Sequence, residues 1–183
     1  MIGYQVSTDI RIVSFEQISE MDLLPEGLSV RTFCECVPPL SISERLGRLS
    51  PLASELKISL CTLRNLADRL TSEEDFYGTH RIMLHGSLGN IVKEDIGRHN
   101  AVDKVIGAAA SLGWDFSQCM MGATGRISLE ILIKAAVMGI PVLFTKKYPS
   151  DLANEYAQRL GIAIAGKIQS AGTEVSGAVW RIV

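Results

Sequence analysis

From residue 52 onward, the chain alternates between short apolar runs and longer stretches in which apolar residues recur every three or four positions. Short apolar runs bounded by turn residues predict strands, and the longer periodicity predicts amphipathic helices. The predicted strands cover residues 81–84, 91–94, 119–123, 140–145, 162–165 and 175–182. The predicted helices cover residues 52–70, 99–112, 128–138 and 150–160.

Turn and capping residues support these boundaries. The Gly-Ser-Leu-Gly run at residues 86–89 joins the first two strands as a hairpin. Gly139 follows the third helix, and Ser150 precedes a fourth helix that ends at Gly161. The run 140–145 is apolar on both faces, which is typical of a central parallel strand. The order of elements predicts an α/β fold, a three-layer mixed sheet with helices on both faces.

Residues 1–52 follow a less regular pattern. Short alternating pieces such as residues 10–13 predict one or two strands, and the Pro-Glu-Gly run at 25–27 predicts a turn. The Pro-Pro pair at 38–39 predicts loop or extended chain directly after two cysteines. We therefore divide the chain into a small N-terminal β and loop appendage, residues 1–52, and an α/β domain, residues 53–183.

Composition and charge narrow the classes of protein. The 183 residues are 47% hydrophobic and 21% charged, which is typical of a globular protein. A net charge of -2 gives no global positive field, so neither nucleic acid nor an anionic membrane is the expected partner. No apolar run is long enough to cross a bilayer, and the first ten residues lack the pattern of a secretory signal. We therefore expect a cytoplasmic protein with reduced thiols.

Polar residues concentrate where predicted strands give way to helices. Residues 94–104 form the densest cluster. Within it, Gly97 permits a sharp turn, and Arg98 and His99 place a charged fork and a titratable ring beside a helix start. Free N–H groups at such a start bind anions. The alternative interpretation is an ordinary capped helix start with solvated charges.

Three later junctions carry similar residues. Thr124 and Ser128 are placed to bind a phosphate or to cap the following helix, and Arg126 between them supplies bidentate donors. Lys146 follows the next strand, where a solvated side chain is the simpler interpretation. The small, polar run 166–172 follows a further strand and forms either an ordinary turn or a loop around a nucleotide-like group. Junctions on one sheet edge would converge on one cleft, which favours an anionic ligand.

The four cysteines fall into two groups. Cys34 and Cys36 form the one close pair, in the loop that precedes the prolines. A thiolate there is a candidate nucleophile, and two neighbouring thiols can form a redox pair or resolve a persulfide. A metal site is less favoured, because no second pair of ligands has zinc spacing. Cys61 and Cys119 lie in apolar stretches and are predicted core residues.

The run Asp-Ile-Gly-Arg-His-Asn-Ala-Val-Asp-Lys-Val-Ile-Gly at residues 95–107 resembles the signature of the formate dehydrogenase accessory sulfurtransferase family (FdhD/NarQ). Gly-Thr-His at 78–80 and Thr-Gly-Arg-Ile-Ser-Leu-Glu at 124–130 continue the resemblance. Further matches are Lys-Ala at 134–135, Gly-Ile-Pro-Val-Leu at 139–143, Leu-Gly-Ile at 160–162 and Gly166. Tyr-Pro-Ser at 148–150 stands where the family usually shows Ala-Pro-Thr.

The resemblance implies a cytidine-deaminase-like α/β domain that carries sulfur. The zinc signature of the deaminases is absent, so base deamination is not expected. In the family, a loop cysteine receives persulfide sulfur from a cysteine desulfurase. It passes that sulfur to the bis-molybdopterin guanine dinucleotide cofactor of formate dehydrogenase. A homodimer is the oligomer that the resemblance favours.

The resemblance also suggests a role for each candidate residue. By order along the chain, Cys34 takes the place of the persulfide-carrying cysteine, and Cys36 assists or replaces it. The cofactor-contacting stretch of the family maps onto Lys167, Ile168, Gln169, Ser170, Ala171 and Gly172. Arg98, His99, Arg126 and Lys146 would line the anionic cofactor cleft.

The chain departs from the family in two respects. Its cysteine loop reads Cys-Glu-Cys at 34–36 where the family has Cys-x-x-Cys, and the family's N-terminal segment before that loop is largely missing. Two hypotheses therefore stand. The first is a sulfurtransferase that acts through Cys34 or Cys36. The second is a binding module that holds a molybdopterin dinucleotide or another nucleotide without moving sulfur.

Overall fold

A computed structural model describes residues 2–6, 13–17, 46–71 and 78–183. The chain divides into two compact units, Met1–Leu40 and Ser41–Val183. In the first unit, β1 (Ile2–Val6) pairs with β2 (Val13–Gln17) as an antiparallel hairpin. The turn expected at 25–27 and the cysteine loop at 34–36 lie outside the described residues.

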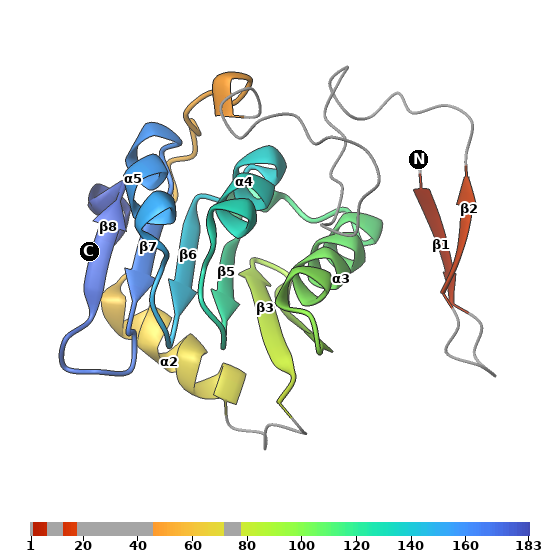
Figure 1. Ribbon diagram of the computed structural model, residues 1–183, viewed down its shortest axis with the longest axis horizontal. Coiled ribbons are helices and arrows are strands. Elements are labelled where there is room, and N and C mark those ends of the chain that lie inside the picture. Colours follow the sequence, from red (N-terminus) through yellow and green to blue (C-terminus); the bar gives the residue numbers. More distant parts are fainter. Residues whose placement is uncertain (1, 7–12, 18–45, 72–77) are drawn as a thin grey trace. The chain divides into compact units, whose positions relative to one another are not determined.

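The second unit is built on one six-stranded mixed sheet (Figure 1). The strands lie in the order β4-β3-β5-β6-β7-β8. The pairs β5·β6 and β6·β7 are parallel, and the other neighbouring pairs are antiparallel. The predicted hairpin and the predicted central parallel strand at 140–145 are both confirmed. The strands are β3 (His80–Gly86), β4 (Gly89–Asp95), β5 (Met120–Ala123), β6 (Val142–Thr145), β7 (Ala163–Gly166) and β8 (Glu174–Gly177).

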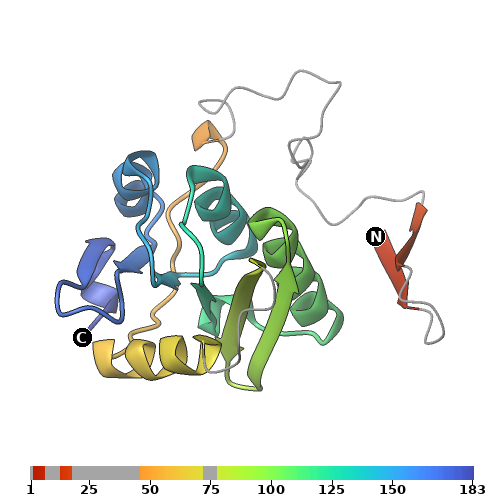
Figure 2. The same ribbon diagram turned by 60° about the horizontal axis from the view of Figure 1, so that its bottom comes forward.

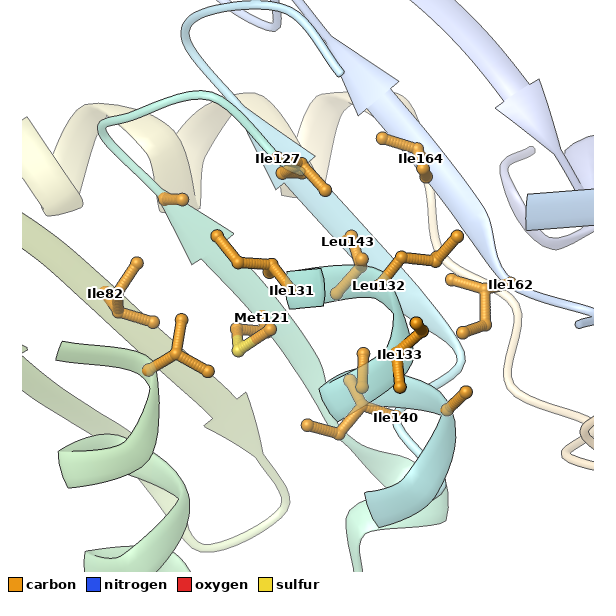
Figure 3. Packing of buried hydrophobic residues seen from close by; sticks show 14 of the residues in the cluster. Ile82, Met121, Ile127, Ile131, Leu132, Ile133, Ile140, Leu143, Ile162 and Ile164 are labelled. Carbon is orange, nitrogen blue, oxygen red and sulfur yellow. The ribbon is translucent and has the colours of Figure 1, made fainter. Parts of the chain in front are cut away.

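Helices cover both faces of this sheet, as predicted (Figure 2). One face is covered by α2 (Leu60–Thr71), whose Leu63 and Leu66 pack in a buried cluster with Phe144 of β6. The opposite face carries three helices and the larger apolar core, drawn in Figure 3. These helices are α3 (Arg98–Ser111), α4 (Leu129–Met138) and α5 (Asp151–Arg159). Within the described residues, no helix combines the length and apolar character needed to cross a membrane.

Two of the predicted helix ends are formed by the expected residues. Gly139 follows α4 in the left-handed region with φ 81°, a conformation that glycine adopts without a steric cost. Ser150 caps α5, because its side-chain oxygen accepts a hydrogen bond from the backbone N–H of Ala153 at 3.2 Å.

The helix predicted over residues 52–70 begins only at Leu60. Backbone groups of residues 52–59 bond to distant parts of the chain: Leu52 N donates to Leu160 O at 3.0 Å, and Ile58 pairs with Ile182. The fully buried Arg181 also donates to the carbonyls of this segment. These tertiary partners hold the segment extended despite its leucine spacing.

Two further predictions were wrong. The strand expected over 175–182 ends at Gly177, whose φ of 74° turns the chain into a short 3-10 helix, Val179–Arg181. Cys61 is exposed, because α2 turns Leu63, Leu66 and its other apolar residues toward the sheet and leaves Cys61 on the outer side. Cys119 is buried, as expected.

Candidate functional site

Four connections of the sheet lie at one of its edges. The strands β5, β6 and β7 are parallel, and β4 runs in the same direction because it and β5 are both antiparallel to β3. The carboxyl ends of these four strands therefore point the same way, as Figure 1 shows for β5, β6 and β7. We call the connections that follow them, residues 96–99, 124–128, 146–150 and 167–173, the carboxyl edge. Ligands of α/β proteins bind at such an edge.

Most polar residues of the signature at 95–107 hold the start of α3 in place. Asp95 Oδ1 accepts hydrogen bonds from Gly97 N at 2.8 Å and Asn100 Nδ2 at 3.4 Å, and Asp95 Oδ2 lies 2.5 Å from Lys104 Nζ. The hydrogen bond from Lys104 is the main reason that the pKa of Asp95 is lowered. These contacts fix the local backbone, so Asp95, Asn100 and Lys104 have structural tasks.

Gly97 serves this turn in a different way from the one expected. Its φ of -90° is open to any residue, so the backbone does not require glycine there. A Cβ at this position would lie 3.1 Å from Asn100 Nδ2. The glycine therefore makes room for the Asn100 side chain rather than for a sharp turn.

A buried ion pair joins α3 to α4. Lys134 Nζ lies 2.6 and 2.7 Å from the two carboxylate oxygens of Asp103, and its side chain is only 9% exposed. The same ammonium donates to the backbone oxygen of His99 at 3.5 Å. Sequence reasoning missed this pair, although a lysine with apolar residues on either side of it in α4 was a signal that this lysine is buried.

Arg98 and His99 remain for other tasks. The Nε of Arg98 is buried and has no hydrogen-bond partner among the described residues. The Nε2 of His99 lies 3.4 Å from the Glu130 carboxylate of α4. Burial lowers the pKa of His99, and the charge of Glu130 opposes that shift. The ring is therefore mainly neutral at neutral pH.

The start of α4 offers a second group of unused donors. Ser128 occupies the capping position, yet it makes no side-chain cap bond, and its buried Oγ has no partner in the described part of the chain. Thr124 does not cap either, because its Oγ1 accepts from Arg81 N at 3.0 Å. Among residues 46–71 and 78–183, no side chain caps the start of α3 either. Two helix amino ends, with their partial positive charge, therefore lie at this edge.

Side chains around Gly125 and Arg126 complete this part of the edge. A Cβ at Gly125 would lie 2.9 Å from Nδ1 of His80, so the glycine lets that ring pack against the backbone. The carbonyl of Gly125 accepts from Thr145 Oγ1 at 2.6 Å, which ties this connection to the end of β6. Arg126 is exposed and Lys146 is half-buried at the same edge.

Residues 167–172 divide into a buried and an exposed part. Lys167, with φ 50°, donates its N–H to Lys147 O at 2.8 Å, and its Nζ lies 2.5 Å from Glu174 Oε1. The side chain of Ile168 is fully buried in the core against α2, so it is not available to a ligand. The exposed members of this connection are Gln169, Ser170, Ala171 and Gly172.

The structure places ten of the twelve predicted site residues on this edge. The other two, Cys34 and Cys36, lie outside the described residues. Burial raises the pKa of the Cys119 thiol to about 11, so this cysteine is a poor nucleophile. Across residues 46–71 and 78–183, no cluster of three His, Cys, Asp or Glu side chains is arranged to hold a metal ion.

Comparison with known proteins identifies the family of the chain. The model of the FdhD/NarQ family matches residues 15–183. The chain belongs to the FdhD/NarQ family. The sequence resemblance is thereby confirmed over far more of the chain than the signature alone.

Named relatives include the sulfur carrier protein FdhD of Anaeromyxobacter dehalogenans strain 2CP-C, 31% identical over 91% of this chain and 63% of the relative. The protein of the same name from Streptomyces avermitilis is 36% identical over 66% of this chain and 45% of its own length. The chain thus spans less than two thirds of either relative.

A solved structure shares the fold. It is a protein of Desulfotalea psychrophila assigned as a formate dehydrogenase accessory protein, with a TM-score of 0.66 and 26% sequence identity. The match covers 76% of this chain and 62% of that one.

Proposed function

We propose that this FdhD/NarQ member is a sulfur carrier that delivers persulfide sulfur to the molybdenum cofactor required by formate dehydrogenase. The observation that carries the proposal is the carboxyl edge. Here Arg98 Nε and Ser128 Oγ are buried and have no partner within the described part of the chain, beside two helix starts without a side-chain cap there. Donors in that arrangement suit an anionic, phosphate-bearing ligand. The family's molybdopterin guanine dinucleotide is a ligand of this class.

The loading step uses a thiolate in the cysteine loop. The thiolate of Cys34, or of Cys36 in its place, attacks the terminal sulfur of a persulfide on the cysteine desulfurase. One S–S bond forms as the other breaks, and the desulfurase cysteine leaves as a thiolate, so no net oxidation occurs. The S–S bond of the carrier persulfide would then break as its terminal sulfur passes to the cofactor. A cellular thiol, which ends in a disulfide with the carrier cysteine, would supply the two electrons that convert this sulfur to sulfide.

The carboxyl edge would hold the cofactor during that transfer. Arg98 and Arg126 supply bidentate donors for phosphate, and Lys146 adds a point charge. His99, largely neutral, offers one ring nitrogen as donor and the other as acceptor, which suits the neutral edge of a pterin or a base. The exposed backbone of 169–172 would follow the guanine dinucleotide end. In this proposal the Ser41–Val183 unit is a cytidine-deaminase-like domain that binds a cofactor.

The proposal is tested by complementation of a bacterial strain that lacks its own sulfur carrier. We expect the unchanged chain to restore formate dehydrogenase activity. The variant that carries both Cys34→Ser and Cys36→Ser should fail to restore it. The matched control is Cys61→Ser, which removes an exposed cysteine of α2 and should restore activity fully. The single variants identify the carrying cysteine.

The alternative, a binding module without sulfur transfer, predicts a different outcome. In that case the double cysteine variant restores activity as well as the unchanged chain does. Arg98→Met separates the cofactor site from the cysteine loop. Under our proposal it weakens cofactor binding at the carboxyl edge without preventing persulfide formation on the cysteine loop.

A further inference from the structure

Tyr148 presents an aromatic ring at the carboxyl edge. It lies in the connection between β6 and α5, and 54% of its surface is exposed. An exposed aromatic ring offers a flat apolar face on which another ring can stack.

The backbone around Tyr148 is held from both sides. On one side, Tyr148 O accepts from Ile127 N at 3.3 Å, and Ser150 N donates to Ile127 O at 2.8 Å. On the other side, Lys147 O accepts from Lys167 N at 2.8 Å. The ring is therefore mounted between the connections that follow β5 and β7, on a rigid base.

A cation lies over the ring. The Nζ of Lys167 is 5.1 Å from the centroid of the Tyr148 ring, and the Glu174 carboxylate holds the same ammonium at 2.5 Å. Lys167 thus places a positive charge directly beside an aromatic platform. A nucleotide carries both matching groups, since its base stacks on aromatic rings and its phosphates pair with cations.

From these contacts we infer that Tyr148 is a specificity-determining residue that stacks against the aromatic base of a nucleotide ligand, with Lys167 beside it. The inference rests on the proposed function, because it deepens the nucleotide site of the carboxyl edge. Tyr148 favours ligands that carry a base over phosphates that lack one. The helix starts of α3 and α4 contribute to the binding of both kinds of ligand.

The test is isothermal titration calorimetry of the full chain with GDP and, separately, with inorganic pyrophosphate. Tyr148→Ala should weaken GDP binding about 5- to 150-fold, the effect of losing one base–aromatic stack, and leave pyrophosphate affinity within about twofold. Tyr148→Phe keeps the ring and should retain GDP affinity within about twofold.

Trp180→Ala is the matched control. Trp180 is also a half-exposed aromatic beside a cation, with Arg181 Cζ 4.1 Å from the centroid of its ring. It follows β8, which runs antiparallel to β7, so it lies at the other end of the strands from the carboxyl edge. Its loss should leave GDP binding unchanged. The unfolding temperature of each variant shows whether it is folded.

Three results would overturn either the stacking on Tyr148 or the anionic site of the proposed function. Equal GDP affinity in Tyr148→Ala and the unchanged chain refutes stacking on Tyr148. GDP binding no tighter than pyrophosphate binding in the unchanged chain also refutes it. Failure of the unchanged chain to bind either ligand refutes the anionic site of the proposed function itself.

Discussion

Replacing Lys134 by methionine tests whether the ion pair between α3 and α4 holds the start of α3. The variant removes the partner of the Asp103 carboxylate and a donor to His99 O while keeping the volume of the side chain. Breaking a fully buried pair costs about 3–5 kcal/mol. The Asp103 side chain is 34% exposed, so water solvates part of the charge left behind. We therefore expect a loss of about 2 kcal/mol in the free energy of unfolding, or about 4–8 °C in Tm.

The assay measures the free energy of unfolding in urea for two matched variants, Lys134→Met and Lys104→Met. Lys104 also pairs with an aspartate at 2.5 Å, but its side chain is 52% exposed. The Asp95 carboxylate left behind is 19% exposed and keeps its hydrogen bonds from Gly97 N and Asn100 Nδ2, so the loss of Lys104 should cost less than about 1 kcal/mol. Adding Asp103→Asn to Lys134→Met should recover part of the loss, because no unpaired charge then remains. Equal costs for the two lysines would refute the reasoning from burial.

Three other predictions concern pH, a buried cation and close packing. The pKa of His99 is lowered in the folded state, so its contribution to stability is present above pH 6.5 and is lost as the pH falls toward the folded pKa. His99→Gln should therefore reduce the pH dependence of the free energy of unfolding between pH 7.5 and 5.5. Under NMR titration, Glu130→Gln should lower the pKa of His99 further. Arg181→Met removes the donor to four backbone carbonyls and should cost about 3 kcal/mol in thermal unfolding; a loss below about 1 kcal/mol would contradict the anchoring role. Gly122→Ala places a Cβ 2.2 Å from Phe144 Cζ and should cost about 2 kcal/mol or more in urea unfolding, whereas unchanged stability would show that the ring moves freely.

The sequence predicted elements whose signals are local. Gly139 and Ser150 mark helix ends because their effect depends on neighbouring residues, and the apolar run of β6 identified a central strand. The start of α2 could not be predicted in the same way. Residues 52–59, which were predicted to be part of this helix, have leucines at helical spacing. Their hydrogen-bond partners include Arg181 and Leu160, which are distant in sequence.

The candidate site shows the same limit. The signature at 95–107 predicts where the candidate site lies, but not the task of each residue in it. Only the contacts in the structure distinguish Asp95 and Lys134, which hold the backbone, from Arg98, whose Nε has no partner among the residues that the structure describes. The pairing of Lys134 with Asp103 spans 31 residues, so no local pattern contains it.

The measurement that tests the central claim most directly is intact-protein mass spectrometry after incubation with a cysteine desulfurase and cysteine, followed by peptide mapping. Our account predicts a gain of about one sulfur atom on the peptide that contains Cys34 and Cys36, reversed by a reductant. The exposed Cys61 serves as the internal comparison and should remain unmodified. No gain on that peptide, with the desulfurase active on a control acceptor, would contradict sulfur transfer and leave a binding module.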